Sequence, residues 1–344
     1  MINSQSDHFS ANAPIEARLM SSPPKKASVD CGFDDLRPRI EEALKLACDF
    51  GSGCPANLGE AMTYALLAPG KRLRPALVLM AAECCGGSME HAIPAAVAVE
   101  MIHAYSLIHD DLPAMDDDDL RRGRPTVHVK FDEATAILAG DGLLTQSFHH
   151  LSKEIQSPEK AIAAIRALSR AAGPARLVGG QADDLSAEKR LDPTRQVVQP
   201  VAGCHDETLD WTESRNDPRL AHLESIHRRK TGALFSVSLD LGAIMVDASK
   251  PQRDTLANYA SSIGLAFQVV DDLLDYTAEA STMGKRTGKD ADRGKLTYPG
   301  LLGLGGARQK AQELIASARC EADKFGSSGR RLRLLADFVL ERAY

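Results

Sequence analysis

Nearly all of the apolar sequence in this chain repeats at the spacing of an α-helix. Nine stretches place Ala, Leu, Ile and Val three or four residues apart, and the alternation typical of strands is nearly absent. Gly, Pro, Ser or Asp stand in most of the gaps, as helix ends and caps require. We therefore predict an all-α fold, a single large bundle of about ten helices. The nine stretches are 36–50, 76–85, 92–109, 134–155, 159–173, 231–245, 253–276, 307–325 and 331–344.

Two segments depart from this helical pattern. Residues 1–29 are rich in Ser, Pro and Ala and lack an apolar run of signal-peptide length, so we predict a disordered leader. Residues 186–220 are polar and aperiodic, which favours a surface insertion between two helices.

Charge and cysteine content exclude several classes of protein. The net charge of −6 and the lack of a basic patch argue against a nucleic-acid or membrane-surface protein. No stretch approaches the ~18 apolar residues of a membrane span. The seven cysteines show no CxxC pair and no metal-finger spacing, which indicates free thiols and a cytoplasmic location.

The apolar stretch 92–109 leads directly into a cluster of six aspartates at residues 110–119. Asp110 and Asp116 are six residues apart, so a straight helix would rotate them about 120° from each other. Pro113 should end or bulge the helix near residues 112–115, because its ring clashes with a carbonyl one turn back. The displaced turn can then bring Asp116 beside Asp110.

A second acidic cluster, DDLLD, follows another apolar helical pattern at 271–275. Asp271 and Asp275 are four residues apart, so they share one face about 6 Å apart along the axis. Like charges at this spacing destabilise a helix, and a divalent cation between them would remove the penalty. Mg²⁺ is commonly held by one or two carboxylates together with water and phosphate oxygens. A solvated acidic turn would explain one such cluster, but two clusters at the ends of apolar helices favour a metal site.

Basic residues accompany the acidic clusters. Lys71 and Arg74 are three residues apart and face one side of a helical turn, with Arg72 on another side. Arginine forks and lysines near Mg²⁺ suit a di- or triphosphate, although GKRTGK does not fit the P-loop pattern. The remaining candidates are Arg121, Arg122, Lys230 beside Thr231, and the Gly-rich loop with Lys285, Lys289 and Lys295.

These motifs, in this order, resemble those of the trans-isoprenyl diphosphate synthases. DDLPAMD followed by DDDLRRG resembles the first aspartate-rich motif of that family, and DDLLD resembles the second. GKRLRP resembles the homoallylic diphosphate site, and GKD…GK.TYP resembles the closing lysine loop. The resemblance runs from about residue 35 to the C-terminus. It implies a helical bundle of the isoprenoid synthase type around a deep central cavity, one polyprenyl synthase domain over 30–344, and a homodimer.

The resemblance also implies roles for individual residues. Mg²⁺, with Mn²⁺ as a substitute, would be bound as three ions with the diphosphate, by Asp110, Asp116 and Asp271 assisted by Asp111, Asp272 and Asp275. The allylic diphosphate would be bound by Arg121, Lys230, Lys285 and Lys295. Isopentenyl diphosphate would be bound by Lys71, Arg74, His103 and Arg122. Thr231 and Gln268 would lie beside the reacting carbons.

The implied reaction is a head-to-tail prenyl transfer. Neutralising the diphosphate lets an allylic cation form, which the double bond of isopentenyl diphosphate attacks. The released diphosphate would then take the proton. No nucleophilic side chain is needed, and His109 is interpreted as a structural neighbour of Asp110.

Product length depends on the cavity wall before the first motif. Tyr105 lies five residues before Asp110, about 7.5 Å down the helix axis, and Ser106 is one residue closer. An aromatic ring there would act as a floor after short products. With the longer first motif, it resembles bacterial farnesyl diphosphate synthases, which extend dimethylallyl and geranyl diphosphate to farnesyl diphosphate. A geranylgeranyl diphosphate synthase, with Tyr105 merely in the core, remains the alternative.

Three other functions fit the sequence less well. His103 and the His109–Asp110 pair faintly resemble a metal-dependent phosphohydrolase, which would leave DDLLD and GKRLRP unexplained. A terpene cyclase needs no isopentenyl site. A non-catalytic regulatory subunit should have lost one acidic cluster, and this chain keeps both.

Overall fold

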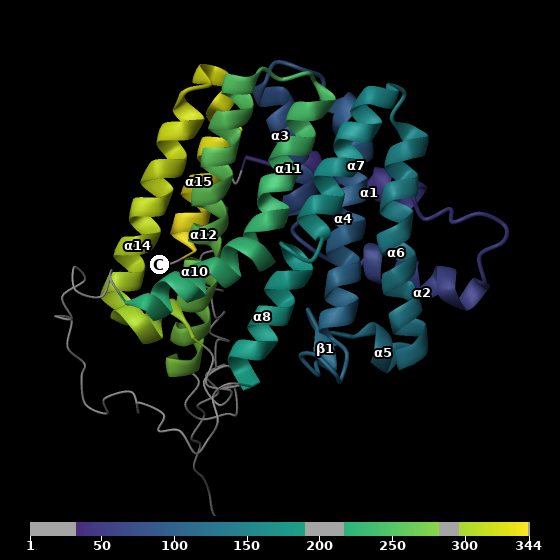
Figure 1. Ribbon diagram of the computed structural model, residues 1–344, viewed down its shortest axis with the longest axis horizontal. Coiled ribbons are helices and arrows are strands. Elements are labelled where there is room, and N and C mark those ends of the chain that lie inside the picture. Colours follow the sequence, from purple (N-terminus) through teal and green to yellow (C-terminus); the bar gives the residue numbers. More distant parts are fainter. Residues whose placement is uncertain (1–31, 190–216, 282–295, 343–344) are drawn as a thin grey trace, which may run out of the picture.

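The core of the molecule is a set of long helices packed side by side (Figure 1). The computed structural model describes residues 32–189, 217–281 and 296–342. The longest helices are α4 (Met89–Asp110), α6 (Glu133–Glu154), α12 (Lys250–Ser281) and α14 (Tyr298–Asp323). The shorter ones are η1 (Asp34–Leu36), α1 (Arg37–Leu46), α2 (Ala56–Leu66), α3 (Leu73–Cys84), α5 (Val127–Lys130), α7 (Pro158–Ala172), α8 (Leu177–Lys189), α10 (Pro218–Lys230), α11 (Gly232–Met245), η2 (Gly326–Gly329) and α15 (Arg330–Glu341). The all-α prediction is confirmed.

The strands of the described residues form one small hairpin directly after the first acidic cluster. β1 (Leu120–Arg121) pairs with β2 (Arg124–Pro125) in antiparallel register. The two residues between them, Arg122 and Gly123, both have positive φ, which matches the twist that two-residue hairpins require. This turn folds Arg121 and Arg122 back toward the end of α4.

The centre of the bundle is formed by α3, α4 and α11, which are apolar on nearly every side. A Cβ on Gly242 of α11 would lie 2.1 Å from the carbonyl oxygen of Val78 in α3, so these two backbones touch. By length and composition α4 could cross a membrane, but 72% of that window is buried inside the fold. Among the described residues it is the one helix that passes this test, and its burial is that of a core helix.

Four α-helices were absent from the sequence prediction: α2, α5, α8 and α10. Helices α8 and α10 extend into the predicted insertion 186–220, so residues 186–189 and 218–220 are helical instead. Pro218 occupies the first turn of α10 and the Asp217 side chain accepts a hydrogen bond from the Arg219 N–H, a regular helix start in polar sequence. The leader 1–29, residues 190–216 of the insertion, and Lys285, Lys289 and Lys295 lie outside the described residues.

Candidate active site

Helix α4 ends at Asp110, and the chain then folds back on itself. Asp111 caps the helix, and the N–H of Asp116 donates to the carbonyl of Asp110 at 2.8 Å. Asp117 takes a left-handed conformation with φ of 52°. The six-residue spacing therefore becomes a local contact, as the break at Pro113 predicts.

The first two aspartates are buried at this helix end. Asp110 is 8% exposed and Asp111 is 3% exposed, and burial raises the pKa of both carboxyl groups. Asp110 accepts a hydrogen bond from Gln181 Nε2 at 2.8 Å, and Asp111 accepts one from Arg121 Nε at 2.6 Å. These donors offset the burial only in part. The helix end is left with a strong preference for a cation.

Lys230, at the end of α10, provides one of the balancing charges. Its Nζ donates to Asp184 Oδ2 at 2.6 Å. Burial disfavours its charge, but the carboxylates of Asp184, Asp110 and Asp116 outweigh burial and raise its pKa. A Cβ on Gly180 would lie 2.4 Å from the Lys230 backbone nitrogen, so a glycine is what lets α8 approach α10 this closely.

The second acidic cluster lies near the end of α12, at the same end of the molecule as the hairpin that follows α4 (Figure 1). Asp271 accepts a hydrogen bond from Arg342 Nη2 at 2.9 Å, and burial raises the pKa of its carboxyl group. Asp272 accepts the N–H of Tyr298 at 2.9 Å, which joins the cluster to the start of α14. Asp275, one turn further along, is exposed.

A chain of hydrogen bonds connects the α10–α11 junction to this cluster. Thr231 Oγ1 donates to Gln268 Oε1 at 2.6 Å. The Gln268 side chain in turn hydrogen-bonds Asp271. The Lys230–Thr231 pair thus connects the two clusters: the charge of Lys230 interacts with Asp110 and Asp116 of the first, and Thr231 is linked through Gln268 to Asp271 of the second.

The predicted isopentenyl site also comes together in the structure. Arg74 Nη1 lies 3.1 Å from His103 Nε2. Because a guanidinium can only donate, that nitrogen accepts and the imidazole is neutral, and burial holds the pKa of His103 well below its usual value. Burial also lowers the pKa of Arg74 to about 10. The charges of Asp271 and Arg122 act on both Arg74 and Lys71.

Tyr105 and Ser106 lie on α4 as predicted, and both are buried. The Tyr105 ring packs edge-on against His109, with 5.8 Å between ring centroids, and its hydroxyl has no hydrogen-bond partner among the described residues. His109 Nε2 donates to the carbonyl of Ile137 on α6 at 3.1 Å. A Cβ on Gly140 would lie 2.1 Å from this imidazole, so His109 packs into a space that is open only because residue 140 is a glycine.

Three residues of this region were missed from the sequence: Gln181, Asp184 and Arg342. The run GGQADD at 179–184 could have indicated the first two, because paired glycines followed by an amide and carboxylates are unusual in a helix. Nothing in the local sequence around Arg342 indicates that it reaches Asp271, 71 residues away.

Among the described residues, no three His, Cys, Asp or Glu side chains form a ready-made metal site. The donors present are nevertheless suitable for Mg²⁺, since they are carboxylate oxygens, and burial raises the pKa of the carboxyl groups of Asp110 and Asp271. Mg²⁺ typically takes only one or two protein carboxylates and completes its shell with phosphate oxygens and water. Asp110, Asp116 and Asp271 could supply such oxygens.

Comparison with known proteins identifies the family. Residues 55–325 match the model of the polyprenyl synthetase family. The chain belongs to this family. Its resemblance to the isoprenyl diphosphate synthases is thereby confirmed, and with it the class of enzyme, a prenyltransferase. The phosphohydrolase interpretation is set aside, and the two histidines behind it are bonded to Arg74 and Ile137.

Similar proteins include synthases of two product lengths. The farnesyl diphosphate synthase of Haemophilus influenzae is 46% identical over 90% of this chain and 97% of its own length. That of Bacillus subtilis is 46% identical over 83% and 88%. A heterodimeric geranylgeranyl pyrophosphate synthase large subunit of Arabidopsis thaliana is 44% identical over 84% and 73%.

Solved structures agree with the fold. An FPP/GFPP synthase from Zymomonas mobilis has 38% identity and a TM-score of 0.70, covering 89% of this chain and 99% of that one. A geranyltransferase from Legionella pneumophila has 29% identity and a TM-score of 0.71, covering 90% and 96%.

The buried carboxylates predict an unusual dependence of stability on pH. The folded-state pKa of Asp110 lies above its unfolded value, so its ionisation costs stability as pH rises through the folded pKa. We expect the free energy of unfolding of Asp110→Asn, relative to wild type, to increase between about pH 3 and pH 7. Urea unfolding of the metal-free protein at several pH values would measure this difference.

Asp35 provides the matched control, because its hydrogen bonds with Arg331 lower its pKa. Its contribution to stability is present above the unfolded pKa and is lost as pH falls through the folded one. Asp35→Asn should therefore lose stability relative to wild type over the same rise in pH. Parallel curves for the two variants would contradict the assignment.

Proposed function

We propose that this protein is a Mg²⁺-dependent farnesyl diphosphate synthase, which condenses isopentenyl diphosphate with dimethylallyl and then geranyl diphosphate. One observation carries the proposal. Burial raises the pKa of two carboxyl groups, Asp110 at the end of α4 and Asp271 in the last third of α12, toward the same end of the bundle, and the cations Lys71, Arg74 and Lys230 act on them. A metal-bound diphosphate and a second diphosphate would match this pairing of charges.

The two acidic clusters would supply the oxygens for the metal. Asp110, Asp116 and Asp271 would hold Mg²⁺, or Mn²⁺ in its place, with Asp111, Asp272 and Asp275 assisting. When bound with the allylic diphosphate, the metal, as three ions, neutralises the charge that develops on this leaving group. Lys230 and Arg121 interact with aspartates of the first cluster and would bind the outer oxygens of that diphosphate, as would Lys285 and Lys295.

The second substrate would be fixed by basic residues of α3, of the loop before it and of the β1–β2 turn. Arg74, held by neutral His103, presents a guanidinium whose orientation is set before binding. Lys71 and Arg122 would contact the same diphosphate. Holding isopentenyl diphosphate close to the allylic carbon turns the coupling into an effectively intramolecular step.

Thr231 and Gln268 would line the place where the new bond forms. Their mutual hydrogen bond directs the Gln268 amide toward Asp271 and fixes both side chains. Neutral dipoles in this position can stabilise an allylic cation without reacting with it. The released diphosphate would accept the proton, since no side chain of the chain is required for that step.

Tyr105 supports a C15 product. Its ring is buried below the first acidic cluster and is fixed by His109, which is itself seated against α6. A wall held in this way would stop the growing chain, with Ser106 as its smaller neighbour. Geranylgeranyl diphosphate is the alternative product, favoured by the plant relatives of similar identity.

We further propose a cytoplasmic homodimer in which residues 30–344 form one synthase domain. Free thiols at Cys48, Cys54, Cys84, Cys85 and Cys320 support a reducing compartment. Exposed apolar side chains on neighbouring elements support association, because such residues gather at protein interfaces. These side chains are Val129 on α5, Ile137 and Leu138 on α6, and Ile162 on α7.

The activity can be tested directly. Purified protein with Mg²⁺, labelled isopentenyl diphosphate and dimethylallyl or geranyl diphosphate should yield farnesyl diphosphate as the main product. Chromatographic sizing of the dephosphorylated products measures the outcome. Phosphate release without chain extension would refute a synthase, and a C20 main product would replace farnesyl by geranylgeranyl.

Substitution of the floor residue tests product length. Tyr105→Ala should shift the main product from C15 to C20 or longer, because it removes the ring. Tyr105→Phe is the matched control and should keep C15, because the hydroxyl has no partner among the described residues. A C15 profile in both variants would place the floor elsewhere.

Association can be tested on the exposed face of α6. Leu138→Lys should convert the dimer to monomer in sedimentation velocity, because it places a charge in the proposed interface. Leu46→Lys alters an even more exposed leucine, on α1, and should leave the dimer intact. Loss of the dimer in both variants, or in neither, would contradict the assignment of the interface.

A further inference from the structure

Arg72 stands between Lys71 and the start of α3 in a strained conformation. Its φ and ψ are 52° and 36°, in the left-handed region that non-glycine residues rarely occupy. Its side chain nevertheless points inward, and the residue is only 5% exposed. Such a conformation persists where the surroundings hold it in place. The contacts that hold it therefore need an explanation.

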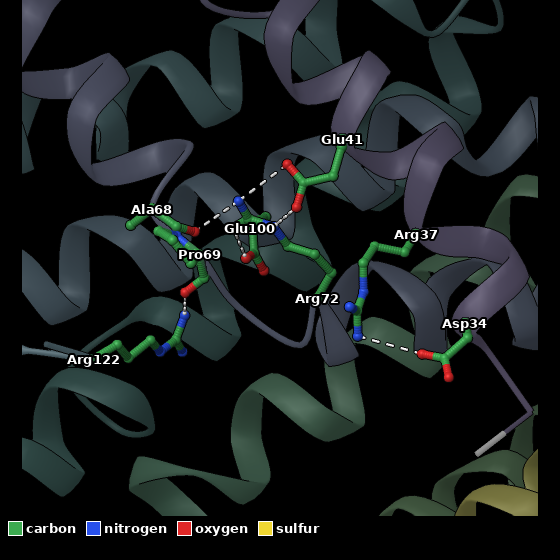
Figure 2. A network of polar contacts seen from close by, with 8 residues as sticks. All are labelled: Asp34, Arg37, Glu41, Ala68, Pro69, Arg72, Glu100 and Arg122. Carbon is green, nitrogen blue, oxygen red and sulfur yellow. Dashed lines mark hydrogen bonds and ion pairs between the residues drawn. The ribbon is translucent and has the colours of Figure 1, made fainter. Parts of the chain in front are cut away.

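Three different segments bind the Arg72 guanidinium (Figure 2). Nη1 donates to Glu100 Oε1 of α4 at 2.8 Å, and Nε donates to Glu41 Oε1 of α1 at 2.7 Å. Nη2 donates to the carbonyl of Ala68 at 2.9 Å. The side chain thus ties α1, α4 and the loop 68–72 together.

The loop 68–72 is also held from its other side. Arg122 Nη1 donates to the carbonyl of Pro69 at 2.6 Å (Figure 2). A Cβ on Gly70 would lie 2.3 Å from that nitrogen, so the contact depends on glycine. Arg72 and Arg122 therefore donate hydrogen bonds to two successive carbonyls, those of Ala68 and Pro69.

Glu100 connects these hydrogen bonds to the predicted isopentenyl site. It is 5% exposed and lies one helical turn before His103, the partner of Arg74. Its negative charge acts on Arg74 and Arg122 as well as on Arg72. The Glu100 carboxylate thus interacts with three arginines. Glu100, Arg72 and Arg122 line one small cavity together with His103.

We propose that Arg72 is a positioning residue, which binds no substrate. Through Glu100 and Glu41 it fixes the loop that presents Lys71, and the start of α3 that presents Arg74, to isopentenyl diphosphate. This inference rests on the proposed function. Lys71 directly precedes Arg72, and Arg74 follows two residues later in the first turn of α3, so the fixed backbone at Arg72 sets the directions of both side chains.

Arg72→Gly separates the side chain from the backbone, because glycine adopts positive φ freely. We expect the KM for isopentenyl diphosphate to rise about tenfold or more, with less than about a twofold change for geranyl diphosphate. Glu100→Gln, which keeps shape and removes charge, should move the same constant in the same direction. Arg72→Lys should raise the KM for isopentenyl diphosphate less than Arg72→Gly does, since a lysine can form one of the hydrogen bonds of Arg72.

Arg331 is the matched control. It too joins separate segments, with bonds to the Gly32 carbonyl, Asp35 and Glu83. Arg331→Met should lower the thermal midpoint while leaving both KM values unchanged. Equal rises in the two KM values of Arg72→Gly, or no rise for isopentenyl diphosphate in either Arg72→Gly or Glu100→Gln, would overturn the proposal.

The readouts keep this inference separate from the proposed function. Wild-type protein that forms no extended product would refute the function itself. Active wild type with unselective variants would refute only the role of Arg72. Should Arg72→Gly fail to fold, Glu100→Gln and Arg72→Lys give the same two KM values and decide the question.

Discussion

Burial of negative charge at the carboxyl end of a helix is the constraint on which this structure depends. That end already carries a partial negative charge, so Asp110 and Asp111 lie where a carboxylate is least favoured. Water is largely excluded from both. The surroundings respond with donors drawn from distant segments, among them Gln181, Arg121 and Lys230. The arrangement is stable enough to form, and it remains short of positive charge.

The basic residues of the site present the opposite problem, a concentration of positive charge. Several arginines lie close together, and mutual repulsion would disperse them without a counter-ion. Glu100 supplies that charge from inside the core, while His103 stays neutral and accepts from Arg74. The guanidiniums are held before any ligand arrives, so binding an anion loses little side-chain freedom.

Sequence reasoning reached the parts of the molecule that depend on local pattern. Helical spacing predicted α4 and α12, and Pro113 predicted the turn after Asp110. Helices α8 and α10 were missed because their faces are mostly polar, and α8 contains two glycines. Contacts such as Gln181 with Asp110 join residues 71 apart and follow from packing, which no short pattern records. The left-handed Arg72 is equally invisible, since nothing in GKRLRP distinguishes it from a solvated arginine.

The position of His109 connects the interior of the bundle to its outer surface. The carbonyl that accepts its hydrogen bond belongs to Ile137, whose side chain is exposed on the outer side of α6. Tyr105 rests on His109, so a single helix separates the inner wall from the outer surface. Any partner pressed against that surface would stiffen the wall behind Tyr105, and a loosened surface would soften it. If Tyr105 limits product length as proposed, the depth available to a growing chain would depend on both faces of α6, only one of which touches the interior.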